Sequence, residues 1–219
     1  MTDHQIVSHD DWIARGRFLA NEKEFTRLRE ELSGERELPW ECVKKEYVFE
    51  GENGGETLAH LFGGRSQLIV YHFMYEPDWD IGCKNCFFWA DNFHGMIPHL
   101  NERDMSVVAT SRAPLEKLQA QAKRFGWTFK WVSCVGNDFN LDFNVWLAPE
   151  TLARGEAVYN YGSEKVTGPS RPGISAFFKD DGQVFHTYST YARGLFDLLP
   201  GGVGESPVTA KTPSCCARR

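Results

Sequence analysis

The feature that most constrains the fold is an apolar run, SQLIVYHFMY at residues 66–75, which shows no regular polar alternation. A strand with one face in water alternates apolar and polar residues, whereas a strand buried on both faces reads as an almost continuous apolar run. The run is also far shorter than the roughly 20 residues that a membrane helix needs. We therefore expect it to form a central strand of an α/β sheet.

The segments after this run alternate between helical and strand-like patterns. Residues 83–104 (CKNCFFWADNFHGMIPHLNERD) indicate a helix that Pro98 kinks or ends, and residues 113–127 (APLEKLQAQAKRFGW) indicate a second helix. MSVVATS at 105–111 and TFKWVSC at 128–134 indicate the next two strands. This β-α-β-α-β order predicts parallel strands joined by right-handed crossovers.

The rest of the chain divides into three parts. Residues 1–38 predict an amphipathic helix docked on the main domain, in which Ser8 stands at capping-box spacing before Asp11. Residues 39–199 form the expected α/β domain, with an aperiodic insertion before a final hairpin that turns at Asp180-Asp181-Gly182 and a last short helix after it. Residues 200–219, which include Cys215 and Cys216, are rich in Gly, Pro, Ser and Thr and are expected to be disordered.

The composition excludes several classes of function. A net charge of -6 without a basic cluster gives no general attraction to nucleic acid or to a membrane surface. The opening residues show no secretory or organelle signal, so a cytoplasmic location is expected. Six cysteines in 219 residues are too sparse for a disulfide scaffold, and in a reducing compartment a close cysteine pair is more often catalytic or metal-binding than structural.

That reasoning directs attention to Cys83 and Cys86, which directly follow the apolar run and open the expected helix. A thiol at a helix N-terminus meets unpaired N–H groups and the positive end of the helix dipole, both of which favour the thiolate. A second cysteine three residues later lies on the same helical face, where it can resolve a mixed disulfide. Nearby acids oppose the thiolate and Lys84 favours it, so the sign of the pKa shift stays open, as do a metal-binding pair and an inert pair.

The order of elements around the C-x-x-C resembles the thioredoxin fold. More closely, LPWECVKKEYVFEG, RSQLIVYHFMY, PDWDIGCKNCFFWADNF, SRAPLEKLQAQAKRFGWTF and VFHTYSTYARG are similar to the family catalogued as domain of unknown function 899, described as predicted dithiol-disulfide oxidoreductases. The resemblance covers about residues 8–197 and implies an α/β, thioredoxin-like three-layer fold with a central mixed sheet. It implies Cys83 as nucleophile and Cys86 as resolving thiol. Pro172 is the nearest match to the thioredoxin cis-proline, and Gly173 stands at that place when counted back from Phe178.

Three further residues are candidates for the site. Trp79 could cover the pair and contact a substrate, or simply pack as a loop tryptophan. His186 and Tyr188 are expected on one face of a strand, near the helix that carries the pair. His186 supports an alternative function, a soft-metal site of Cys83, Cys86 and His186, although a hydrogen-bonded strand histidine is the simpler reading.

A lesser alternative is peroxide reduction, for which a Pro-x-x-x-Thr-x-x-Cys approach to the nucleophile is missing before Cys83. The principal expectation is a dithiol-disulfide oxidoreductase without a cofactor. Its expected partners are an unknown disulfide substrate and a recycling reductant, and the chain is expected to be a monomer or a homodimer.

Overall fold

The computed structural model describes residues 6–34, 39–163, 166 and 168–192. It divides into two compact units, Met1–Pro39 and Trp40–Arg219, each described by itself. The first unit holds α1 (His9–Ala14) and α2 (Arg17–Gly34). The Ser8 hydroxyl oxygen accepts a hydrogen bond from the Asp11 N–H at 3.1 Å, which confirms the predicted cap. The single helix expected here is interrupted at Gly16, whose N–H bonds back to the Ile13 carbonyl, and docking of this unit stays a prediction.

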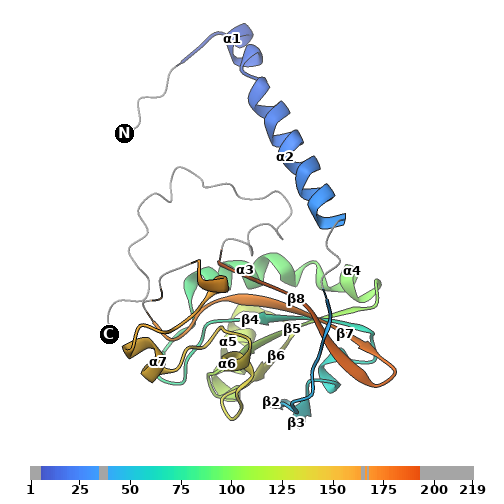
Figure 1. The fold of residues 1–219 in the computed structure, drawn as a ribbon, viewed down its shortest axis with the longest axis vertical. Helices are drawn as coiled ribbons and strands as arrows, with labels where there is room; N and C mark the ends of the chain where they lie inside the picture. Colours follow the sequence, from blue (N-terminus) through green and yellow to red (C-terminus); the bar gives the residue numbers. More distant parts are fainter. Residues whose placement is uncertain (1–5, 35–38, 164–165, 167, 193–219) are drawn as a thin grey trace. The chain divides into compact units, whose positions relative to one another are not determined.

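The second unit is built on an eight-stranded mixed sheet with strand order β1-β8-β7-β4-β5-β6-β2-β3 (Figure 1). The central strands β4, β5 and β6 are parallel to one another, whereas the other pairings are antiparallel. The predicted parallel β-α-β-α-β core is thus confirmed. The strands are β1 (Glu41–Cys42), β2 (Val48–Gly51), β3 (Gly54–Thr57), β4 (Gln67–His72), β5 (Met105–Ser111), β6 (Lys130–Ser133), β7 (Gly173–Asp180) and β8 (Gln183–Tyr191).

The helices of this unit cover both faces of the sheet. The predicted break at Pro98 is confirmed, because the helix that begins after Cys83 is capped at its C-terminus by Gly95, and Pro98 lies in the first turn of the helix that follows. Gly126 ends the following helix in the left-handed conformation, with φ 71°. The helices are α3 (Lys84–His94), α4 (Ile97–Asn101), α5 (Leu115–Phe125), α6 (Phe139–Asp142) and α7 (Pro149–Ala153), with 3-10 turns η1 (His60–Phe62) and η2 (Asn160–Gly162).

Two separate cores form on the two sides of β4. Ile69 and Tyr71 join the core that includes Leu118 of α5 and Cys86 of α3. Leu68 and Val70 join the other core, which includes residues of α6 and η1. Each large apolar side chain buried in these cores stabilises the fold by about 1.5–3 kcal/mol. The prediction of a strand buried on both faces is therefore confirmed.

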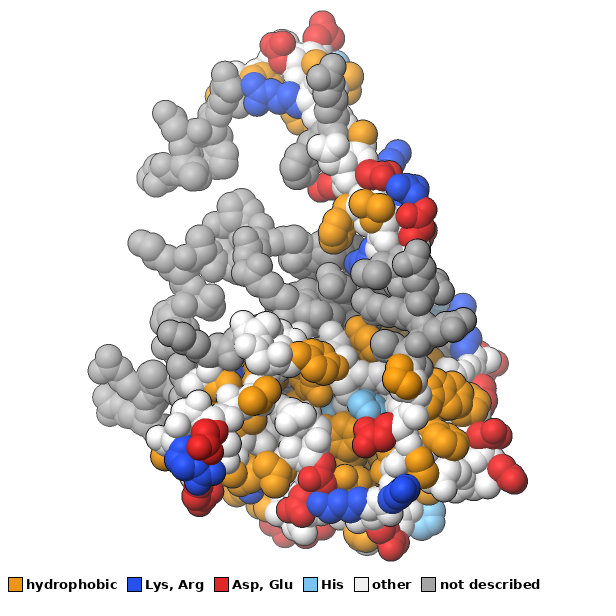
Figure 2. All heavy atoms as spheres, in the orientation of Figure 1, with side chains coloured by type: hydrophobic (Ala, Val, Ile, Leu, Met, Phe, Trp, Pro, Cys, Tyr) orange, Lys and Arg blue, Asp and Glu red, His pale blue; other side chains and the backbone are white. Residues whose placement is uncertain are grey.

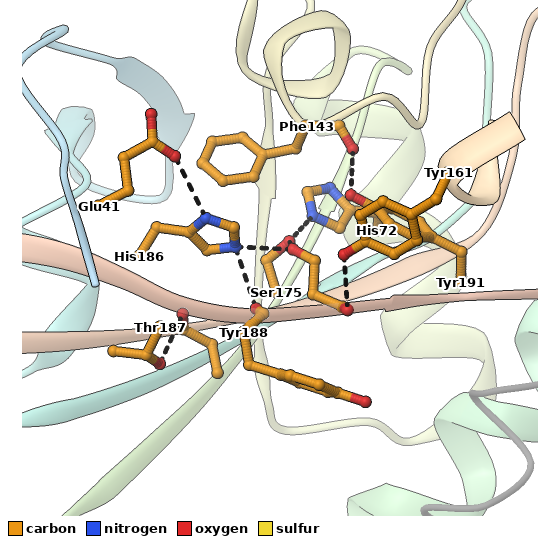
Figure 3. A network of polar contacts seen from close by, with 11 residues as sticks. Glu41, His72, Phe143, Tyr161, Ser175, His186, Thr187, Tyr188 and Tyr191 are labelled. Atoms are coloured by element: carbon orange, nitrogen blue, oxygen red, sulfur yellow. Dashed lines mark hydrogen bonds and ion pairs between the residues drawn. The ribbon is translucent and has the colours of Figure 1, made fainter. Parts of the chain in front are cut away.

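The final hairpin contains an irregularity that changes which residues share a face. Its turn is formed by Asp181 and Gly182, both with positive φ, as the sequence predicted. Along β8, however, the register shifts so that Tyr188 pairs with Ala176 while His186 pairs with Phe177, leaving one extra residue on β8. An extra residue reverses the alternation of side chains. His186 and Tyr188 therefore point to opposite faces (Figure 3), and the prediction that they align is wrong.

Within residues 6–34, 39–163 and 168–192, no helix has the length and apolar character needed to cross a membrane. The short helix predicted after the hairpin falls beyond Ala192, outside the described residues. The tail 200–219, with Cys215 and Cys216, also lies outside them.

Gly173 marks a point of very close packing at the start of β7. A Cβ added to Gly173 would lie 2.7 Å from Cγ1 of Val145 and 3.1 Å from the ring of Tyr191. Because overpacking a filled core costs about 1–3 kcal/mol, we expect Gly173→Ala to lower the free energy of unfolding by about that amount in urea.

The matched control is Gly95→Ala at the end of α3. Gly95 has φ -69° and ψ -16°, and no neighbouring atom lies within 4 Å of the position of its added Cβ. We expect this variant to unfold at or slightly above the wild-type midpoint, because alanine restricts the unfolded chain more than glycine does. Equal losses in the two variants would contradict the packing argument.

Candidate active site

Cys83 stands at the N-cap of α3, where the sequence predicted it. Its backbone is extended, with φ -63° and ψ 129°, and its N–H donates to the carbonyl oxygen of Met74 at 3.0 Å. Gly82 makes this approach possible, because a Cβ on Gly82 would lie only 2.7 Å from Cε1 of Phe73. The loop therefore packs against Phe73 and delivers Cys83 to the first turn of the helix.

The two thiols of the pair differ in accessibility. Both are free, but Cys83 is partly exposed, whereas Cys86 is 1% exposed in the core beneath α3. Only Cys83 is thus open to a substrate. This division matches the roles that the family resemblance implies, a nucleophile outside and a resolving thiol behind it.

Local contacts lower the pKa of Cys83 to about 6. The largest cause is the hydrogen bond from the Cys86 thiol; burial acts in the opposite direction, and the backbone N–H groups of Cys86 and Asn85 favour the thiolate further. The sign of the shift, which the sequence left open, is therefore downward. At neutral pH most Cys83 side chains are thiolates, the reactive form of cysteine.

The acids before the pair do not decide this shift. Glu76 is 7% exposed and lies 3.6 Å from the guanidinium of Arg112, which itself stacks on the ring of Trp146 at 3.7 Å. Burial raises the pKa of Glu76, and the charge of Arg112 opposes that rise. Glu76 is thus engaged with Arg112, and the helix N-terminus and the second thiol control Cys83.

Cys86 has the opposite electrostatics. Burial raises the pKa of Cys86 well above its ordinary value, and the neighbouring Cys83 thiolate raises it further, both as a hydrogen-bond acceptor and as a charge. Two groups act against this rise, the Tyr71 hydroxyl and the Met74 N–H. Cys86 therefore holds its proton in the resting state.

Tyr71 is a residue that the sequence analysis missed. Its hydroxyl is buried and makes no hydrogen bond of standard geometry among the described residues, while Cys86 is the polar group that it influences. Burial and the nearby Cys86 raise the pKa of Tyr71, so the phenol keeps its proton and can only donate to a thiolate. The sequence did not single out Tyr71, because an uninterrupted apolar run does not indicate which of its residues face α3.

Trp79 lies in the loop before Cys83, and its covering of the pair stays a prediction. It is partly buried against the same core as Cys83 and Cys86. Lys117 of α5 holds its loop by donating to the carbonyl oxygens of Pro77 at 2.8 Å and Trp79 at 2.9 Å. No local sequence signal connected Lys117 with this loop, because the two segments are brought together only by the fold.

Gly173 begins β7, the strand beside β4, whereas Pro172 directly precedes β7 and Tyr188 lies on β8, one strand further out. Gly173 pairs with His72, so Pro172 lies at the end of β4 from which the chain leads to Cys83. The peptide bond before Pro172 is trans, as are all peptide bonds of the described residues, so the implied cis-proline is not present. Tyr188 shares a row with Ala176 and Ile69, which places it on the face that carries α3.

His186 lies on the other face of the sheet. Its ring contacts Phe143 and Phe177, with centroids 5.1 and 5.5 Å apart, and both belong to the core opposite Cys86. The described residues also contain no group of three or more Cys, His, Asp and Glu side chains arranged to hold a metal. The alternative metal site of Cys83, Cys86 and His186 is therefore wrong. The extra residue in β8 turns the His186 side chain to the face opposite the cysteine pair.

The sequence model of the family described as "Bacterial protein of unknown function (DUF899)" matches residues 1–201. The chain belongs to the DUF899 family. No curated protein matches its sequence. Among solved structures, peroxidoxin BcpB from Mycobacterium tuberculosis aligns with a TM-score of 0.50 at 13% identity, over 69% of this chain and 84% of that chain. A mutant of PrxQ from Xylella fastidiosa aligns with a TM-score of 0.50 at 10% identity, over 72% and 90%.

At such low identities these likenesses show the fold alone. Together with the sheet order, they establish that this DUF899 chain has a thioredoxin-like fold. The expected fold class is thereby confirmed.

The dominant contact at Cys83 can be tested with Cys86→Ala. A group with a lowered pKa stays ionised down to that pKa, so alkylation of wild-type Cys83 by iodoacetamide should reach half its maximal rate near pH 6. Removing the Cys86 thiol removes the largest cause, so the midpoint should move upward toward the ordinary cysteine value. Mass spectrometry of the Cys83 peptide over a pH series measures both curves.

Cys134→Ala is the matched control. Cys134 is 1% exposed, and its thiol bonds to the carbonyl oxygen of Ser111, away from the pair. It should leave the Cys83 midpoint unchanged. A midpoint that stays near pH 6 in Cys86→Ala would refute the assigned cause.

Proposed function

We propose that this DUF899 protein catalyses thiol-disulfide exchange, with Cys83 as the attacking thiolate and Cys86 as the resolving thiol. The observation that carries the proposal is the geometry at the start of α3. A partly exposed thiol with a pKa of about 6 stands at the helix N-cap, and a buried thiol donates a hydrogen bond to it. A nucleophile and a resolving group within reach of each other are what this chemistry requires.

The reaction proceeds in two balanced steps. The Cys83 thiolate attacks one sulfur of a substrate disulfide, and the other sulfur leaves as a thiolate that takes a proton from solvent. Cys86 then loses its proton and attacks the Cys83 sulfur, which releases the second substrate thiol and forms the Cys83–Cys86 disulfide. The substrate is reduced to two thiols while the pair is oxidised. A thiol reductant reverses the same steps on the protein and restores the dithiol.

The second step requires a group that stabilises the Cys86 thiolate, because burial disfavours that charged form. The Tyr71 hydroxyl stays protonated and has no competing hydrogen-bond partner of standard geometry among the described residues. It therefore serves as the donor that stabilises negative charge on Cys86 as the resolving attack begins. The role of Tyr71 is positioning and electrostatic, and the bond-making atoms remain the two sulfurs.

An aromatic disulfide, 5,5′-dithiobis(2-nitrobenzoate), separates the two steps, because each step releases one coloured thiolate. The measurement uses a background in which serine replaces Cys42, Cys215 and Cys216, so that these thiols do not react with the reagent. Cys134 is kept because it is buried. The otherwise unchanged pair should release two equivalents. Cys86→Ser should release one and keep the mixed disulfide on Cys83, and Cys83→Ser should show no fast release. Two equivalents from Cys86→Ser would sink the proposal.

Tyr71→Phe tests the donor in the same assay. We expect the first release to keep its rate and the second to slow by about 10- to 100-fold, as expected for loss of a hydrogen bond to a charged group worth about 1.5–3 kcal/mol. Stopped-flow absorbance resolves the two phases.

Tyr47→Phe is the control for losing a buried phenol, because Tyr47 lies on the opposite face of the sheet and donates to Asp142. Both phases should keep their rates in this variant. If Tyr71→Phe left the second phase as fast as in Tyr47→Phe, Tyr71 would have no part in the resolving step.

A further inference from the structure

A cavity lies on the face of the sheet opposite Cys86. It has a volume of about 630 Å³, and Figure 2 shows hydrophobic side chains gathered around a histidine on this side, with acidic side chains next to it. Its walls come from β1 and the segment after it, the end of α6, η2 and β8. The lining residues that carry the argument are Glu41, Tyr47, Phe143, Tyr161, His186 and Tyr191.

The hydrogen bonds of His186 decide which ring nitrogen carries the hydrogen in the neutral form (Figure 3). Its Nε2 lies 3.1 Å from the carbonyl oxygen of Tyr188 and 2.8 Å from Oγ of Ser189. A carbonyl oxygen only accepts hydrogen bonds, so Nε2 carries the hydrogen. His186 is therefore a donor to Ser189, not its base, and the Glu41–His186–Ser189 arrangement does not activate a serine nucleophile.

The far end of this hydrogen-bond chain requires the same direction. Ser189 Oγ lies 2.9 Å from Ser175 Oγ, which lies 2.9 Å from Nε2 of the buried His72. The other nitrogen of His72 lies 3.0 Å from the amide oxygen of Asn140, an acceptor, so His72 carries its hydrogen there and accepts from Ser175. Burial lowers the pKa of His72 to about 4 and keeps it neutral. In this hydrogen-bond chain from His186 to His72, every hydrogen is thus donated in the direction away from the cavity.

The consequence is a cavity that offers acceptors. Nδ1 of His186, the nitrogen without a hydrogen in the neutral ring, lies 3.6 Å from a carboxylate oxygen of Glu41. Two facing acceptors have no hydrogen between them and leave room for a shared donor. The tyrosine hydroxyls of the wall donate elsewhere, Tyr47 to Asp142, Tyr161 to the Ser189 carbonyl and Tyr191 to the Phe143 carbonyl.

Ring faces and charge complete the site. Phe143 and His186 pack edge to face at 5.1 Å, and Tyr161 and Tyr191 do so at 5.5 Å, so the wall is largely aromatic. Of the two lysines that line the cavity, Lys45 is bound to the carboxylates of Asp138 and Asp142, at 2.9 and 2.6 Å. Lys44 is exposed to solvent and is the one lining cation for which an acid partner is not seen among the described residues.

We propose that this cavity binds a planar organic cation, of the amidinium or guanidinium class, whose N–H groups bridge Glu41 and Nδ1 of His186. Such a cation supplies the hydrogens that both acceptors need, pairs with the Glu41 carboxylate and stacks on the aromatic wall. Strand pairing holds the two acceptors together, because Glu41 of β1 lies opposite His186 of β8. The site is separate from the cysteine pair and does not rest on the proposed exchange chemistry.

Three probes of equal shape and different charge test the proposal on the full chain: benzamidine, benzamide and benzoate. At about pH 8, where an ordinary imidazole is neutral, calorimetry should show benzamidine binding at least tenfold more tightly than benzamide, with benzoate weakest. The His186 ring resonances should shift in NMR spectra as benzamidine is added. Cys83→Ser should bind benzamidine as the wild type does, which keeps this result distinct from the exchange assay.

Glu41→Gln should weaken benzamidine at least tenfold, because it removes the carboxylate charge and keeps the side chain's size. Glu46→Gln is the matched control, since Glu46 is an exposed acid in the same segment that does not line the cavity. It should bind benzamidine as the wild type does.

Tighter binding of benzoate, in the manner of an anion site built on Lys44, would overturn the proposal. So would equal binding of benzamide, no binding of benzamidine at tens of millimolar, or shifts confined to residues outside the cavity.

Discussion

The position of β4 between β5 and β7 is the constraint on which the rest of the structure depends. Hydrogen bonds to a parallel strand on one side and an antiparallel strand on the other pair both edges of β4, and a separate core covers each of its faces. Because side chains alternate along a strand, neighbouring residues are sent to different cores. Tyr71 reaches the core of the cysteine pair, and His72 reaches the opposite side of the sheet. One strand thus supports both the candidate active site and the hydrogen-bond chain behind the cavity on the opposite face.

The two faces handle buried polar groups in different ways. On one face, His72 is kept neutral and bonded through both ring nitrogens, so its polar atoms are satisfied within the protein. On the other, the Tyr71 hydroxyl has no hydrogen bond of standard geometry among the described residues. An unsatisfied buried hydroxyl costs about 1–3 kcal/mol. The first arrangement stabilises the resting fold, whereas the second leaves a donor available to Cys86, as the proposed resolving step requires.

Much of the fold followed from sequence patterns that are local. The apolar run of β4, the helix start at Cys83 and the Asp181-Gly182 turn are each determined by residues next to one another in the chain. What the sequence could not predict depends on distant pairing. The extra residue in β8 is defined only against β7, and it moved His186 away from the cysteine pair.

The same limit applied to the individual contacts of the two sites. The contact of Glu41 with His186 requires β1 to pair with β8, which lies near the other end of the domain's sequence. The direction of the Cys83 pKa shift depended on hydrogen bonds to its sulfur rather than on the charges visible in the sequence.

The electrostatics of the cysteine pair impose an order on its two steps. In the resting state the negative charge of Cys83 is one of the causes that raise the pKa of Cys86, so the thiolate that makes the outer sulfur reactive also keeps the inner one protonated. Once Cys83 forms a mixed disulfide, its charge is gone, and that cause disappears with it. The Tyr71 hydroxyl and the Met74 N–H, which favour the Cys86 thiolate, then meet less opposition. In the proposed reaction, attack on the substrate by Cys83 thus removes one of the causes that keep Cys86 protonated, which favours the resolving step.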